Sequence, residues 1–305
     1  MNTLLHLTAR ILIGLVQALP LGLVVILGRA SGAVAWHLDR RHRRVALANL
    51  KLAFPEKTER EIRGIARENF RRLGENYLGG IKTAGMDADD IRRILNLRGR
   101  EHLATEADGH NLVFAIGHFG NFELYARAGL FLPGWRFGVT YRGLKQPALN
   151  RLLVALRERS GTLFFERRQD SGAMKAALRE GGLTMSFLAD QHAGDNGARL
   201  PFLGHECSTS TAPAVFALRY RCALHTAICS RTAPGRWRIE LGPAIPTHKD
   251  GHARSVEAIT TDVNAALEIA VRKDPANWFW VHRRWKPASR RQQARRKPPT
   301  ETGND

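Results

Sequence analysis

Cysteine is scarce in this chain of 305 residues, which contains Cys207, Cys222 and Cys229. No two of them form a Cys-x-x-Cys pair, and no group of cysteines and histidines has the spacing of zinc ligands. An odd number of cysteines without a framework is typical of reduced, buried thiols in a cytosolic environment. We therefore expect no metal site.

Motifs that hold nucleotides or nucleic acids are also missing. The sequence has no glycine-rich Walker loop, no zinc finger and no RNP-like aromatic motif, so we expect neither a nucleotide cofactor nor a nucleic acid partner. Acidic residues are few: 28 aspartates and glutamates against 47 lysines and arginines give a formal charge of +19. Such an excess needs a polyanionic partner, which on charge alone is a nucleic acid, an anionic lipid or an acidic protein.

One long stretch without charge, residues 11–28, helps to decide between these three kinds of polyanionic partner. Its length is close to the roughly 20 residues that cross a bilayer, and Pro20 is expected to kink it. Arg10 precedes it, while Arg29 and an arginine cluster at residues 40–44 follow, so the positive-inside bias places the rest of the chain in the cytoplasm. A buried helix of a soluble protein is the alternative. Beside a membrane anchor, anionic lipid explains the basic charge better than nucleic acid does.

The remaining pattern predicts strands that alternate with helices. Helices are expected over residues 43–54, 58–82, 87–97, 122–130, 146–160, 173–180, 209–220 and 253–272, and strands over 111–116, 135–141, 183–188, 223–230 and 236–241. This order predicts an α/β fold with a mixed, mostly parallel sheet flanked by helices. We divide the chain into a membrane anchor (1–30), a globular domain (31–286) and a basic, disordered tail (287–305).

The most informative segment is Gly-His-Phe-Gly-Asn-Phe-Glu at residues 117–123, which follows an apolar strand and opens a helix. Ligands of open α/β sheets bind at such strand ends. Gly117 and Gly120 let the backbone turn tightly and approach a substrate. His118 can take a proton near neutral pH, and Glu123 would converge on it if His118 lies in the turn before the helix. This pair is the candidate catalytic centre.

The chemistry expected of the pair is general-base catalysis. A carboxylate bound to one imidazole nitrogen fixes the tautomer and leaves the other nitrogen free to deprotonate a hydroxyl. Because no serine or cysteine nucleophile stands near the pair, we expect direct transfer to an acceptor hydroxyl. Backbone N–H groups at the start of the helix are suited to hold the developing oxyanion. The alternative is structural, a histidine that caps the helix.

The same segment resembles the H-x4-E motif of the bacterial lipid A late acyltransferases, the lauroyl/myristoyl acyltransferase family. Further stretches along nearly the whole chain are similar to motifs of that family: RRVALANLKLAFPEKTE at residues 43–59, YR at 141–142, LADQ at 188–191, PFLG at 201–204 and NWFWVHRRWK at 277–286. The resemblance implies a glycerolipid acyltransferase-like fold with an N-terminal membrane helix, and an acyltransferase domain over residues 31–286.

The resemblance also implies a reaction: transfer of a fatty acyl group from acyl carrier protein to a hydroxyl of a Kdo-bearing lipid A precursor. It implies His118 and Glu123 as the catalytic pair, on the cytoplasmic face of an inner membrane. The expected partners are acyl carrier protein, an anionic glycolipid acceptor and the membrane. No cofactor is expected, because the thioester is already activated.

Polar and glycine residues near the motif are candidates for binding substrate. They are Gly120, Asn121, Arg142, Arg167, Asp190 and Gln191. Arg142 and Arg167 are suited to bind phosphate groups, although a salt bridge or a solvated loop would explain them equally. Asp190 is expected to orient Arg142, to support a turn or to contact substrate. Asn121 is expected to cap the helix or to touch substrate.

Two departures from the family pattern leave the acceptor open. Gly143 follows Arg142 where the family often has proline, and His192 follows Gln191 where an acidic residue is common. One alternative is therefore an acyltransferase for another glycolipid or a phospholipid, although Glu123 argues against the His-x4-Asp pattern of glycerophosphate enzymes. Another is a membrane-tethered binding protein without catalysis. The tryptophans at 278, 280 and 285 are expected in the core, with an interfacial aromatic belt as the alternative.

Overall fold

A computed structural model of the protein describes residues 2–103, 110–141, 143, 146–166 and 169–287. The helices are α1 (Asn2–Ala18), α2 (Leu21–Leu38), α3 (Arg40–Ala53), α4 (Glu59–Ala84), α5 (Ala88–Ile94), α6 (Pro147–Glu158), α7 (Ser171–Arg179), α8 (Ala212–Tyr220) and α9 (Val256–Lys273), with 3₁₀ helices η1 (Arg100–Leu103), η2 (Phe122–Phe131), η3 (Gly194–Asn196) and η4 (Pro275–Asn277). The strands are β1 (Leu95–Arg98), β2 (Leu112–Ile116), β3 (Arg136–Tyr141), β4 (Leu163–Glu166), β5 (Leu183–Leu188), β6 (Ala198–Phe202), β7 (His205–Thr209), β8 (Ala223–Ala233), β9 (Arg236–Leu241), β10 (His248–Lys249) and β11 (His252–Ala253).

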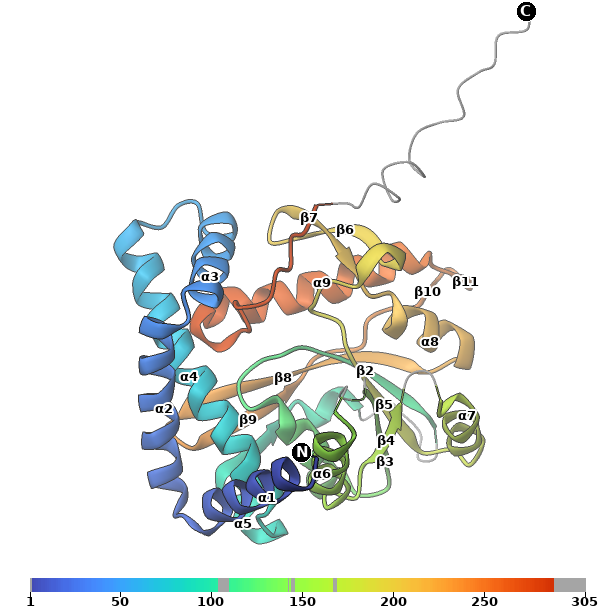
Figure 1. Cartoon of the computed structure of the whole chain (residues 1–305). Helices are drawn as coiled ribbons and strands as arrows, with labels where there is room; N and C mark the ends of the chain where they lie inside the picture. The colour runs from blue at the N-terminus through green and yellow to red at the C-terminus, as the bar shows by residue number, and fades with distance from the viewer. Residues whose placement is uncertain (1, 104–109, 142, 144–145, 167–168, 288–305) are drawn as a thin grey trace, which may run out of the picture.

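A seven-stranded sheet in the order β1-β9-β8-β2-β5-β3-β4 forms the centre of the molecule (Figure 1). Its neighbouring strands are parallel except for β8 and β9, which pair antiparallel. The predicted α/β fold with a mixed, mostly parallel sheet is therefore confirmed. Because β2 and β5 are adjacent and parallel, the loops at their carboxyl ends meet at one edge of the sheet.

Strand β2 shows why these residues form a central strand: all five of its side chains are buried. Val113 and Ala115 point into one hydrophobic cluster, which includes residues of α8 and α9. Leu112, Phe114 and Ile116 point into the other, which includes residues of α5 and η2. An apolar run without polar alternation is what a strand covered on both faces requires.

The N-terminal apolar stretch forms two helices instead of one kinked helix. Pro20 has no N–H group and restricts the residue before it, so α1 ends at Ala18 and α2 begins at Leu21. The expected boundary between anchor and domain at residue 30 falls within α2, which packs along α4. The helix expected from residue 58 is α4, and Thr58 and Glu61 form a capping box at its start.

Some elements differ from the prediction. The helix expected at 87–97 ends at Ile94, because Leu95–Arg98 pairs with β9 as an edge strand. The segment after the His-x4-Glu motif is a 3₁₀ helix, a form in which every third residue shares a face; Phe122, Tyr125, Ala128 and Phe131 fit that period. Strands β4, β6 and β7 were not predicted. The run of β4 is short and its partner β3 lies elsewhere in the chain, while β6 and β7 form a hairpin outside the central sheet.

Candidate active site

The loop that follows β2 is held in a single conformation by close packing. Gly117 has no room for a side chain, since a Cβ atom there would lie 2.6 Å from the ring of Phe119. Gly120 has a φ of +49°, and a Cβ atom there would lie 2.7 Å from the carbonyl oxygen of Cys229. Phe119 is fully buried and forms an antiparallel bridge with Trp278. His118 is left as the side chain of this loop that reaches the surface, with 15% of it exposed.

His118 is bound to Asp190 across the sheet edge. Its Nδ1 lies 2.8 Å from Oδ1 of Asp190, and its backbone N–H donates to Oδ2 of the same carboxylate at 2.8 Å. The strand register explains the meeting: Ile116 of β2 lies opposite Leu188 of β5, so the residues two positions beyond each strand end face each other. With Nδ1 occupied, Nε2 is the imidazole nitrogen left for a substrate hydroxyl.

Asp190 is a fully buried carboxylate that three donors stabilise. The third donor is the indole N–H of Trp278, which lies 2.8 Å from Oδ2. Burial alone would raise the pKa of Asp190, but the charge of His118 and the hydrogen bonds from His118 and Trp278 lower it below its usual value. Asp190 is therefore ionised at neutral pH and acts on the imidazole. Its predicted contact with substrate does not fit a side chain with no exposed surface.

The C-terminal segment of residues 275–286 holds this arrangement in place. Side-chain amides of α3 and α4 fix the segment: Asn49 donates to the carbonyls of Trp280 and His282, and Asn69 to those of Ala276 and Trp278. The segment in turn accepts the N–H of Gly120 through the carbonyl of Asn277. The rings of Trp278 and Trp280 are buried 4.6 Å apart, so their predicted place in the core is confirmed.

Glu123 is not the carboxylate bound to His118, which corrects the expected arrangement of the pair. Instead it accepts two hydrogen bonds from Arg157 of α6: Nη2 to Oε1 at 2.6 Å and Nε to Oε2 at 3.0 Å. The 3₁₀ geometry of η2 directs Glu123 toward α4 and α6, where its Cγ lies 3.3 Å from the position of a Cβ on Gly80. Bidentate pairs of this kind are strong and geometrically specific. No local pattern near Glu123 predicted Arg157 as its partner, because Arg157 lies 34 residues away in the chain.

The expected oxyanion site built from backbone N–H groups finds little support. The N–H groups of His118, Phe119 and Gly120 bond to Asp190, Gly117 and Asn277, and that of Phe122 bonds to Gly120. Donors already paired within the protein are not available to a substrate oxygen. The guanidinium of Arg157 is the cation that lines the same groove as His118 among the described residues.

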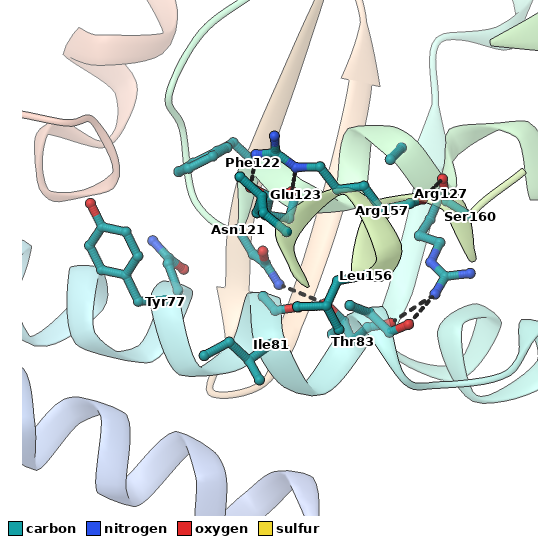
Figure 2. Close-up of a pocket in the computed structure, with 15 residues that line it drawn as sticks. Tyr77, Ile81, Thr83, Asn121, Phe122, Glu123, Arg127, Leu156, Arg157 and Ser160 are labelled. Atoms are coloured by element: carbon teal, nitrogen blue, oxygen red, sulfur yellow. Dashed lines mark hydrogen bonds and ion pairs between the residues drawn. The ribbon is translucent and has the colours of Figure 1, made fainter. Parts of the chain in front are cut away.

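Two neighbouring cavities share the Glu123–Arg157 pair in their lining. A mostly apolar cavity of about 260 Å³ lies between α4, η2 and α6, with Tyr77, Ile81, Phe122, Ala126 and Leu156 among its lining (Figure 2). An open groove of about 630 Å³ passes His118, Gln191 and Ser210. Glu123 and Arg157 line both spaces, so the pair separates an apolar chamber from a more polar groove that contains the imidazole.

The other predicted binding residues are placed as follows. Gln191 lines the groove beside His118, and Gly120 lines a small cavity on the other side of the imidazole. Asn121 is buried and lines the apolar cavity; its side chain makes no capping hydrogen bond and donates weakly to Thr83 at 3.4 Å (Figure 2). Arg142 and Arg167 lie outside the described residues.

No group of three or more histidine, cysteine or acidic side chains is placed to hold a metal ion within the part of the chain that the structure describes. The three cysteines are buried and unpaired with one another. Burial raises the pKa of the Cys222 thiol to about 11, so this thiol is neutral and packs as a small apolar group.

The chain is similar to known acyltransferases along nearly its whole length. The sequence profile of the bacterial lipid A biosynthesis acyltransferases matches residues 3–287. The chain is 28% identical over 285 residues to a lipid A biosynthesis lauroyltransferase of Escherichia coli K12, covering 89% of this chain and 88% of that protein. It is 26% identical over 273 residues to the palmitoleoyltransferase of the same organism (88% and 86%), and 28% identical over 279 residues to a lipid A biosynthesis acyltransferase of Haemophilus influenzae (89% and 86%). The chain therefore belongs to the bacterial lipid A biosynthesis acyltransferase family and is an acyltransferase that moves groups other than aminoacyl groups.

Proposed function

We propose that the protein transfers a fatty acyl group from the thioester of acyl carrier protein to a hydroxyl of a lipid A precursor, at the cytoplasmic face of the inner membrane. The observation that carries this proposal is the His118–Asp190 hydrogen bond beside an apolar cavity. An activated acyl group needs a base for the attacking alcohol and a dry place for its chain. His118 lines the groove, and the apolar cavity next to it shares Glu123 and Arg157 with that groove.

In the proposed reaction Nε2 of His118 takes the proton of the acceptor hydroxyl while its oxygen attacks the thioester carbonyl. The new C–O bond forms, the C–S bond breaks, and the imidazolium returns its proton to the departing thiolate. Asp190 stabilises the imidazolium because its buried carboxylate stays ionised. No protein nucleophile is needed, since the acceptor supplies the attacking oxygen. General-base catalysis of this kind accounts for roughly 10²- to 10⁴-fold in rate.

Glu123 acts through Arg157 in this proposal. The guanidinium of Arg157 faces both cavities and would stabilise the negative charge that develops on the carbonyl oxygen. Glu123 fixes the plane of that guanidinium through two hydrogen bonds. Glu123 is therefore a positioning residue, and His118 remains the group that handles the proton.

The two cavities suit the two substrates. The apolar chamber under Glu123 would take the acyl chain, and the groove lined by Gln191, His192 and Ser210 would take the acceptor. Arg127 closes part of the chamber: it is buried and donates to the carbonyls of Thr83 and Ala84 at the end of α4 (Figure 2). The formal charge of +19 favours an acidic carrier protein as donor and an anionic lipid as acceptor.

Mass spectrometry of lipids from cells with and without the gene tests the proposal. Lipid A should gain one acyl group with the native gene and with His248→Ala in the exposed β10–β11 hairpin, but not with His118→Ala. The purified enzyme should use acyl carrier protein thioesters in preference to coenzyme A thioesters. A one-acyl shift on a different lipid would overturn the acceptor, and full activity of His118→Ala would overturn the base.

A further inference from the structure

Helix α2 is the described helix that is long and apolar enough to cross a membrane, but this property alone does not decide how it meets lipid. A helix that packs against a protein surface passes the same test of length and composition. The partners of α2 in the fold therefore decide between a helix that crosses the bilayer and one that lies along it.

Close backbone contact joins the middle of α2 to α4, which lie side by side (Figure 1). A Cβ atom on Gly28 would lie 2.7 Å from the carbonyl oxygen of Gly74, and one on Gly32 would lie 2.1 Å from that of Phe70. From Gly28 to Gly32 the chain advances along α2, while the contacted residue moves back from Gly74 to Phe70 in α4, so the two helices are antiparallel. Extending this register places α2 beside roughly residues 64–81 of α4. Just before α2, Gln17 near the end of α1 donates to the carbonyl of Ile81.

The stretch of α4 beside α2 is charged. It contains Arg67, Glu68, Arg71, Arg72 and Glu75, and Arg29 near the middle of α2 forms ion pairs with Glu68 at 3.0 Å and Glu75 at 3.3 Å. Glu75 is fully buried and also pairs with Arg231 of β8 at 3.0 Å. The ion pairs of Arg29 therefore tie the middle of α2 to α4 and, through Glu75, to β8. Helix α2 is part of the folded domain and not a separate anchor.

These contacts are incompatible with α2 crossing a bilayer in the folded protein. If α2 crossed, the antiparallel stretch of α4 would enter the hydrocarbon with its five charged residues. Charged side chains at the centre of a membrane helix cost roughly 2.5–3.5 kcal/mol each by insertion measurements. We infer that α2 lies along one leaflet, and that the outward faces of α1 and α2 bind the surface of an anionic bilayer.

Both helices present an apolar face for such a surface. The exposed large apolar side chains are Leu7, Ile11, Leu12 and Leu15 on α1 and Leu23, Ile26, Leu27, Val34 and Leu38 on α2. On α2 they lie opposite the residues packed on α4, among them Val24, Gly28 and Gly32. Helices of this kind insert their apolar faces about 5–10 Å into the headgroup and acyl boundary.

A basic groove beside α1 supplies the matching charge. A space of about 480 Å³ between α1 and α6 is lined by Arg10, Arg151, Arg159 and His6, and no acidic residue is among its described lining. Each arginine near an anionic leaflet adds about 1 kcal/mol of attraction. Arginines around an open groove at the edge of an apolar helix suit lipid phosphates, which argues for an anionic lipid surface as the occupant.

The sidedness of the two ends of α2 tests the inference without any measurement of activity. Ala18→Cys lies just before α2 and Arg40→Cys just after it, and both positions are exposed. The three native cysteines are buried, so the parent protein gives the background. A membrane-impermeant maleimide should label both new cysteines in inside-out vesicles and neither in spheroplasts. Labelling of the two positions from opposite sides would show that α2 crosses the membrane.

A pair of glycine variants gives an independent test. Gly28→Leu should lower the melting temperature of the full chain by more than 5 °C, because the side chain meets the backbone of α4. Gly22→Leu on the same helix has open space around its Cβ and should leave the melting temperature unchanged. Equal melting temperatures for the two variants would mean that α2 does not pack on α4, and would overturn the inference.

Discussion

Two carboxylates lie near the imidazole, and they differ in every physical respect that matters for catalysis. Asp190 has no exposed surface and accepts hydrogen bonds from His118 and from Trp278. Glu123 keeps 30% of its side chain exposed and is bound by Arg157. Sequence proximity favoured Glu123 as the partner of the histidine, whereas the parallel sheet brings Asp190 to it from 72 residues away.

The difference shows how one motif can serve two tasks. A buried carboxylate with several donors is suited to hold a proton-accepting imidazole in one tautomer. A partly exposed carboxylate that accepts two hydrogen bonds from an arginine is suited to orient that guanidinium toward a substrate. In the proposed mechanism the His-x4-Glu spacing therefore links the base to the arginine that stabilises the oxyanion, and His118 and Glu123 do not form a dyad by themselves.

The largest expected effect comes from Asp190→Asn. Loss of the charge removes the stabilisation of the imidazolium and permits the wrong tautomer, which should lower kcat by about 10³- to 10⁴-fold. Asp250→Asn in the exposed β10–β11 hairpin should have no effect. Steady-state rates with acyl carrier protein thioesters measure both variants, and circular dichroism checks that Asp190→Asn is folded. A loss below tenfold in a folded variant would remove Asp190 from the mechanism.

Glu123→Gln should have an intermediate effect. The variant weakens charged hydrogen bonds worth about 1.5–3 kcal/mol each, so kcat should fall about 10- to 100-fold. Arg157→Lys, which keeps the charge but loses the bidentate geometry, should fall in the same range. Glu158→Gln, one residue along α6 and exposed, is the matched control. A loss for Glu123→Gln as large as that for Asp190→Asn would restore Glu123 as the direct partner of His118.

The smallest expected effect is a change in how stability depends on pH, from His282→Gln. Burial lowers the pKa of His282 to about 4, and its Nε2 accepts the N–H of His192 at 3.0 Å. The unfolded histidine binds a proton near pH 6.5, so between pH 6.5 and 4 the unfolded state holds more protons and stability falls as the pH is lowered.

Urea midpoints at pH 7 and pH 5 measure this loss. His282→Gln keeps an acceptor for His192 and should reduce the loss by roughly 1 kcal/mol, since the imidazole is only partly buried. The control His248→Gln, in the exposed β10–β11 hairpin, should leave the loss of stability between pH 7 and pH 5 unchanged. An unchanged pH dependence in His282→Gln would mean that His282 is not held neutral by the fold.

Much of the fold could be predicted because local patterns decide it. The apolar run at residues 112–116 has no polar alternation, so it reads as a strand covered on both faces, and the structure places it in the middle of the sheet. Thr58 and Glu61 mark the start of α4 through local hydrogen bonds. Strands β4, β6 and β7 escaped prediction because their stability comes from pairing, which local composition does not record.

The candidate site was predictable in part. His118 stands between two glycines at a strand end, and that context pointed to it directly. The partner of the imidazole was not predictable from spacing, although Asp190 stands two residues beyond another apolar strand. The missing fact was that β2 and β5 are neighbours in parallel register. Arg157 carried no signal, because a long-range contact leaves no period in the sequence. Trp278 was expected in the core, but its hydrogen bond to Asp190 was not.

The sequence by itself determined the class of fold, the histidine at a strand end, the net positive charge and the apolar N-terminal stretch. Each of these follows from the chemistry of neighbouring residues. Tertiary structure alone decided which carboxylate binds the imidazole, which cation lines the groove beside it and which face of α2 is free. These depend on strand order and helix packing, which are set by the burial of the whole core and not by any one segment.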